Sequence, residues 1–186
     1  TTGGQNVAFG VETLNANNAS NNTAIGFRAL LANTTGTSNV AVGANALDAC
    51  TTGSMCVAVG REALSSLTTG EKNIAVGNRA LEAATDPEDN VAIGQQTLEE
   101  NVSGDRNIAV GTRALDNNTV SDNVAVGHET LEANTTGSGN VAMGTRALEA
   151  NTTGTQNVAV GALALDANTD QSNNTAIGYA ALSANT

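Results

Sequence analysis

The sequence predicts a parallel β-solenoid of about eleven coils, each containing one strand. A five-residue motif close to Asn-Val-Ala-Val-Gly recurs along all 186 residues. Its copies begin every 16 or 17 residues, and a fixed period of this kind is typical of stacked, nearly identical units. Within each copy, β-branched residues alternate with alanine, which is the period of a strand. Parallel strands in successive coils would satisfy each other's backbone hydrogen bonds about 4.8 Å apart.

We number each coil from the first residue of its motif, which is asparagine in ten coils and Cys56 in the fourth. Position three is always alanine, position five always glycine and position nine always leucine. Because the repeats fill the chain, they predict one solenoid domain spanning 1–186. We expect this domain to be a segment of a longer fibre protein.

The strand is expected at positions two to four, as in 158–160. Both of its faces are apolar, so both should be covered. We expect valine and isoleucine to fill the interior of the coil, and the small alanine face to let another layer approach. Glycine at position five should end the strand, because a neighbour comes too close for a Cβ or because the backbone needs a positive φ.

Positions six to twelve, such as 145–151, favour a short helical turn. Their apolar residues stand at eight, nine and eleven, which strict alternation cannot place on one face. Arg79 and Glu82 are three residues apart, as are Arg146 and Glu149, a spacing at which opposite charges meet on a helix. A second strand is the alternative. Positions thirteen to seventeen are rich in Thr, Gly and Ser and should form the return turn.

The asparagines of position one predict a buried ladder, because stacked amides can donate to one neighbour and accept from the other. The alternative is that each asparagine caps its own turn. Both roles are structural. The residues concerned are Asn6, Asn22, Asn39, Asn73, Asn90, Asn107, Asn123, Asn140, Asn157 and Asn174.

Two further groups have predicted structural roles. Cys50 and Cys56 flank one turn, where a disulfide would close it in an extracellular protein, and free buried thiols are the alternative. The alanines of position three exclude polar residues in every coil, which predicts a surface for self-association. The alternatives are that leucine at nine or alanine at eleven forms the contact, or that the position-three alanines pack beneath the helical turn of their own coil. The predicted oligomer face includes Ala41, Ala75, Ala92, Ala109, Ala125 and Ala142.

Composition argues against several functions. A formal charge of −11 and few basic residues disfavour nucleic acid and anionic membranes as partners, and no apolar run is long enough to insert into a membrane. The single histidine, His128, has no recurring nucleophile beside it. With two cysteines, a zinc site lacks ligands. We therefore expect no enzyme activity, no cofactor and no metal.

The pentads Asn-Thr-Ala-Ile-Gly at 22–26 and 174–178, with the Asn-Val-Ala-Val-Gly copies, resemble the head repeats of trimeric autotransporter adhesins. The longer pattern with Ala-Leu and Asn-Thr-Thr-Gly resembles repeats of bacterial and phage fibre proteins. The resemblance implies a β-roll assembled as a homotrimer. The adhesin repeat is nearer fourteen residues and lacks the Ala-Leu segment, so this chain departs from it.

These observations predict a non-catalytic structural or adhesive fibre segment. It would serve as an extracellular spacer or a surface-presenting rod of an adhesin or tail fibre, at a cell surface or on a virion. The expected partners are further copies of the chain and a cell-surface or glycan ligand. The alternative is an ice- or carbohydrate-binding module that uses a ladder of identical side chains, such as the threonines at 135–136 and 152–153.

Overall fold

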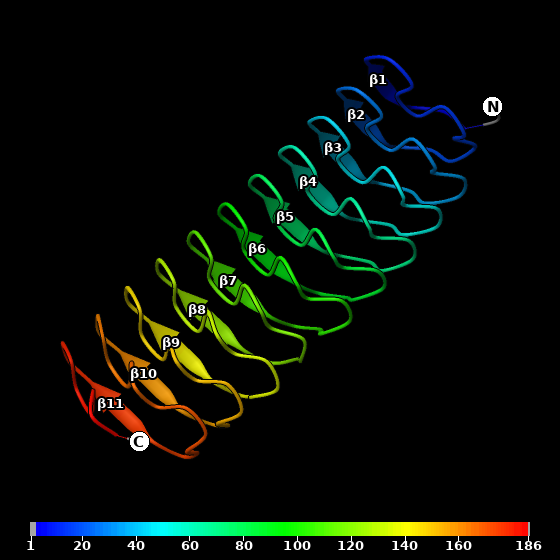
Figure 1. The fold of residues 1–186 in the computed structure, drawn as a ribbon. Coiled ribbons are helices and arrows are strands. Elements are labelled where there is room, and N and C mark those ends of the chain that lie inside the picture. The colour runs from blue at the N-terminus through cyan, green and yellow to red at the C-terminus, as the bar shows by residue number, and fades with distance from the viewer. Residues whose placement is uncertain (1–2, 186) are drawn as a thin grey trace.

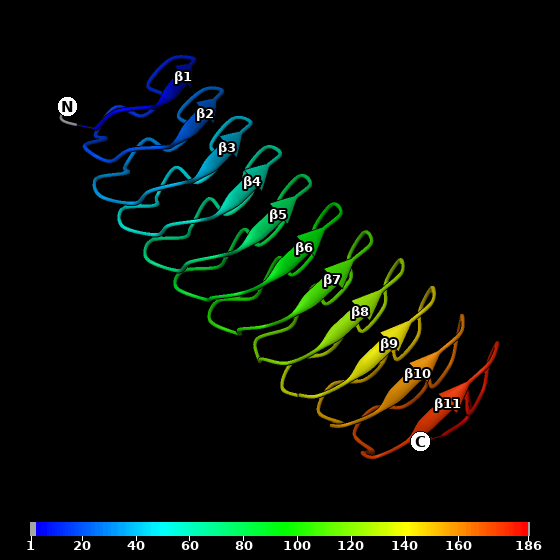
Figure 2. The same cartoon turned by 180° about the vertical axis from the view of Figure 1, so that it is seen from behind.

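The coils stack one on another along a single axis, with one strand in each coil (Figure 1). The computed structural model describes residues 3–185; residues 1, 2 and 186 of the predicted domain lie outside this range. Seen from behind, the strands lie side by side along one wall, and the turns form the remaining walls (Figure 2). The predicted parallel β-solenoid is therefore confirmed.

All eleven strands belong to one parallel sheet, ordered as in the chain. Each strand pairs with the next in register, so that position three faces position three: Ala41 pairs with Ala58, and Ala58 with Ala75. The strands are β1 (Val7–Phe9), β2 (Thr23–Ile25), β3 (Val40–Val42), β4 (Val57–Val59), β5 (Ile74–Val76), β6 (Val91–Ile93), β7 (Ile108–Val110), β8 (Val124–Val126), β9 (Val141–Met143), β10 (Val158–Val160) and β11 (Thr175–Ile177).

The strand side chains point the opposite way from the prediction. Alanine at position three is buried in every strand from β2 to β11, whereas positions two and four are half-buried or exposed. The interior is narrow and is filled from the opposite wall by the leucines of position nine, such as Leu98 and Leu115, which are fully buried. Little more than a methyl group fits opposite them. The expectation that valine and isoleucine fill the interior is therefore wrong.

Positions six to twelve form two consecutive reverse turns, and residues 3–185 contain no helix. In the third coil, the Ala46 amide donates to the Gly43 carbonyl at 3.4 Å, and the Cys50 amide donates to the Leu47 carbonyl at 3.2 Å. Positions seven and nine have left-handed backbone, with φ of 57° at Asn45 and 52° at Leu47. Such residues cannot continue a right-handed helix. The predicted helical turn is therefore wrong.

The left-handed turns explain two features of the sequence. No β-branched residue occurs at position seven or nine, because branching at Cβ makes positive φ costly. At position five the backbone has φ between 125° and 146°, and a Cβ on Gly77 would lie 2.1 Å from the Gly94 carbonyl oxygen. Glycine is therefore required there by both the conformation and the close approach of the next coil.

Candidate functional surfaces

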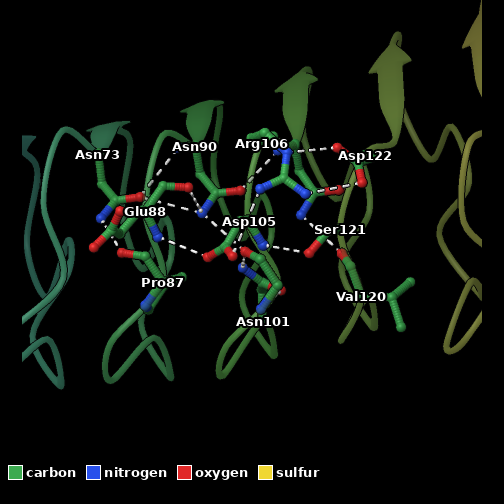
Figure 3. A network of polar contacts seen from close by, with 12 residues as sticks. Asn73, Pro87, Glu88, Asn90, Asn101, Asp105, Arg106, Val120, Ser121 and Asp122 are labelled. Atoms are coloured by element: carbon green, nitrogen blue, oxygen red, sulfur yellow. Dashed lines mark hydrogen bonds and ion pairs between the residues drawn. The ribbon is translucent and has the colours of Figure 1, made fainter.

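The asparagines of position one join each coil to the next. The backbone amide of Asn39 donates to the side-chain oxygen of Asn22 at 2.9 Å, and Asn39 Nδ2 donates to the Gly53 carbonyl at 2.7 Å. Figure 3 shows the same arrangement for Asn73 and Asn90. The column is thus paired between coils, as expected, but mainly to backbone groups. It is buried at Asn22, Asn39, Asn73, Asn90, Asn107, Asn123, Asn140 and Asn157.

A second asparagine column, at position twelve, was missed by the sequence analysis. Here the side-chain amides do bond to one another: Asn151 Nδ2 donates to Asn134 Oδ1 at 2.9 Å, and Asn168 Nδ2 donates to Asn151 Oδ1 at 3.0 Å. The amide ladder predicted for position one is therefore most regular at position twelve. The available signal was asparagine in eight of eleven coils, interrupted by Cys50, Leu67 and Ala84.

Both columns converge on the carbonyl of position fifteen. The Gly36 carbonyl accepts from Asn22 Nδ2 and from Asn33 Nδ2, each at 2.9 Å. Where Leu67 replaces asparagine, the Gly70 carbonyl is met at 3.5 Å by the thiol of Cys56, a weak donor. This corner of the solenoid is therefore the place where both ladders are interrupted.

The two cysteines lie at this corner and are not joined. Cys50 and Cys56 are free and fully buried. Burial raises the pKa of the Cys50 thiol to about 12 and also raises the pKa of Cys56. The predicted disulfide is absent, and the alternative of buried free thiols describes the structure.

The threonine columns already use part of their hydrogen-bonding capacity within the solenoid. At position thirteen, Thr135 Oγ1 donates to the Thr152 carbonyl at 3.0 Å, and Thr152 Oγ1 donates to the Thr169 carbonyl at 3.1 Å. The neighbouring threonines at position fourteen, such as Thr136 and Thr153, are exposed. Aspartate interrupts their column at Asp86 and Asp170. A continuous lattice-like surface of threonine is therefore not formed.

The outward side chains of positions two, four and six form what we call the strand face. Valine and isoleucine predominate at positions two and four, and Ile74, Ile93 and Ile108 are each about 40% exposed, at 37%, 40% and 43%. The alanines predicted as the oligomer face, including Ala92, lie on the other side of the strand and are fully buried. That prediction is wrong, because the coil's own core covers the alanines.

Acidic side chains are excluded from the strand face. None of the 18 acidic residues of the chain occurs at positions two, four or six. Arg61 is its one arginine or lysine, and His128 its one histidine. The strand face is thus a nearly uncharged strip on a strongly acidic rod.

The charges gather instead along the turn edge formed by positions seven and ten. Arg146 Nε lies 2.6 Å from Glu149 Oε2, and Arg79 Nη2 lies 2.7 Å from Glu99 Oε1 in the next coil. The three-residue spacing of Arg and acid therefore does bring the charges together, although the backbone is a turn and not a helix. These ion pairs link adjacent coils as well as residues within one coil.

Three carboxylates on this edge lie close enough to share a cation. Oxygen atoms of Glu129, Glu132 and Glu149 lie within 4.8 Å of one another. Arg113 pairs with Glu129 and Glu132, and Arg146 pairs with Glu149. Two guanidinium groups thus already supply the positive charge that a metal would bring.

Comparison with known proteins gave no relative. No family model matches the chain, and no curated protein or solved structure matches it. Within residues 3–185 there is also no helix long and apolar enough to span a membrane.

Proposed function

We propose that this chain is a non-catalytic structural segment of an extracellular fibre, in which copies associate side by side through the strand face. The observation that carries the proposal is the combination of exposed valine and isoleucine with the exclusion of all 18 acidic residues. An apolar strip that runs the length of a protein is typical of an interaction surface. A sheet face that is exposed to water would instead be expected to carry mainly polar residues, which alternate along each strand with the apolar residues of the buried face.

The size of the strand face suits a stable interface. Eleven coils at about 4.8 Å give a rod of roughly 50 Å, and five residues of each coil give a width of roughly 15 Å. Their product is near the ~800 Å² per partner of a standard protein interface. The partner we propose is a second copy of the chain, because its strand face has the same length, the same coil spacing and no opposing acidic charge.

A parallel arrangement keeps identical coils level along the whole rod. Each coil then meets its own counterpart, so one favourable contact is repeated eleven times. The resemblance to the heads of trimeric adhesins favours three copies. The charged turn edge and the threonine-rich turns would remain outside the assembly, where a cell-surface or glycan ligand would meet them.

The proposal is tested by placing charge on the strand face. The triple variant Ile74→Lys, Ile93→Lys and Ile108→Lys replaces one exposed isoleucine with a cationic side chain in each of three successive coils. We expect folded monomers, because the substitutions leave the coil interior untouched. The matched control, Thr69→Lys with Thr136→Lys and Thr153→Lys, adds the same charge on exposed turns and should keep its assembly. Equal masses for the two variants would contradict an interface at the strand face.

A further inference from the structure

A column of carboxylates runs along the turn edge in the second half of the rod. Position ten is acidic in six successive coils, and successive coils are about 4.8 Å apart. Like charges at this spacing repel one another and favour protonation of one member. We call this set the carboxylate column: Glu82, Glu99, Asp116, Glu132, Glu149 and Asp166.

The arginines beside the column occur in every second coil. Position seven carries Arg79, Arg113 and Arg146 in the fifth, seventh and ninth coils, with Gln96 and Glu129 in the coils between them. The column therefore has twice as many carboxylates as arginines. The sixth coil of the chain, which contains Glu99, has Gln96 and not an arginine at position seven.

Glu99 is the least solvated member of the column. The residue is 6% exposed, and its Oε1 forms an ion pair with Arg79 of the previous coil. Its second oxygen, Oε2, is buried and has no hydrogen-bond partner. A buried carboxylate oxygen without a donor is costly. The hollow beside it is lined by Arg79, Glu82 and Glu100, so Arg79 is its one cation.

Asp116 follows Glu99 in the column, one coil later. Arg113 Nε lies 3.5 Å from Asp116 Oδ2, but Arg113 also pairs with Glu129 and Glu132. One guanidinium thus serves three carboxylates. A proton on Asp116 would remove one negative charge beside the buried carboxylate of Glu99.

We propose that Asp116 binds a proton at mildly acidic pH beside the buried carboxylate of Glu99, and that this proton makes the rod more stable near pH 5 than near pH 8. The charge of the pair changes from −2 to −1, and the carboxyl that carries the proton becomes a hydrogen-bond donor. The proposal concerns each single coil stack and does not depend on how copies assemble.

The charges around Asp116 agree with this. Burial, together with the neighbouring charges of Glu99 and Glu132, raises the pKa of its carboxyl from 3.8 to about 6 against the opposing effect of Arg113. Between pH 4 and 6 the folded chain therefore holds a proton that the unfolded chain has released. Stability must then rise as the pH falls through 6 and level off near the unfolded value of 3.8.

Carboxyl carbon NMR of the full chain tests the proposal directly. We expect Asp116 to titrate near pH 6, and its midpoint to fall by about half a pH unit or more in Glu99→Gln, because a like charge is removed. The matched control is Glu149→Gln, which removes a carboxylate of the same column two coils further on and should leave the Asp116 midpoint in place. A midpoint near 3.8 in the unsubstituted chain, or one that Glu99→Gln does not move, would overturn the proposal.

Thermal unfolding gives a second readout. The unsubstituted chain should melt at a higher temperature at pH 5 than at pH 8, and Asp116→Asn should lose most of that difference because it carries no titratable proton. Circular dichroism before heating would establish that the variant is folded like the unsubstituted chain. If Asp116→Asn retained the full difference, other groups would be responsible and the proposal would fail.

Discussion

The backbone amide of Asn107 donates to the side-chain oxygen of Asn90 at 2.8 Å, one full coil away. Asn90 Nδ2 in turn donates to the Gly104 carbonyl at 2.9 Å. One buried side chain therefore satisfies two backbone groups, the carbonyl of Gly104 in its own coil and the amide of Asn107 at the start of the next. This relationship, repeated along the rod, explains why position one tolerates so little variation within the chain.

Replacing Asn90 by alanine should destabilise the solenoid by about 1 to 3 kcal/mol, because a buried amide and a buried carbonyl lose their partners. Denaturant unfolding measures the loss. The control is Asn117→Ala, since Asn117 is exposed and bonds to one carbonyl, that of Glu132; it should cost less than about 0.5 kcal/mol. Equal losses in the two variants would show that the buried column has no special role.

Replacing Ala92 by leucine should cost about 1 to 3 kcal/mol, because the larger side chain overpacks the narrow interior. Thr153→Leu, at an exposed turn, should stay within about 0.5 kcal/mol of the parent. Both are measured by denaturant unfolding. If Ala92→Leu kept its stability and lost its assembly, the alanines of position three would instead form an intermolecular contact.

The thiols of Cys50 and Cys56 should be almost inert in the folded chain. Both are fully buried, and burial raises the pKa of each thiol, so very little thiolate is present at pH 8. We expect a small aromatic disulfide reagent to react at least ~100-fold more slowly with the folded than with the denatured chain, since reaction requires opening of the coil. Rapid reaction of both thiols under native conditions would contradict this corner of the structure.

Much of the fold follows from the spacing of the repeats. The nearly constant interval between motifs predicts parallel strands in register, and Ala41 does pair with Ala58. The direction of the strand side chains could not be predicted, because Val-Ala-Val is apolar on both faces. It is decided by the leucine that enters from the opposite wall, as Leu47 does, and by left-handed turns that a seven-residue segment of good helix formers does not reveal.

The functional surfaces were only partly predictable. The prediction of a structural role for Asn39 is correct, but its partners are backbone groups, the carbonyl of Gly53 in its own coil and the amide of Cys56 in the next. The column that contains Asn134 and Asn151 was missed because three successive coils interrupt it. The oligomer face was assigned to Ala92 and its equivalents, an error that follows directly from the wrong direction of the strand.

The mass of the unsubstituted chain in solution, measured by light scattering over a range of concentrations, tests the central claim most directly. One copy weighs 18.5 kDa. Self-association through the strand face predicts a discrete assembly of about three times that mass. A chain that remains at 18.5 kDa at every concentration, with its strand face open to solvent, would contradict the account.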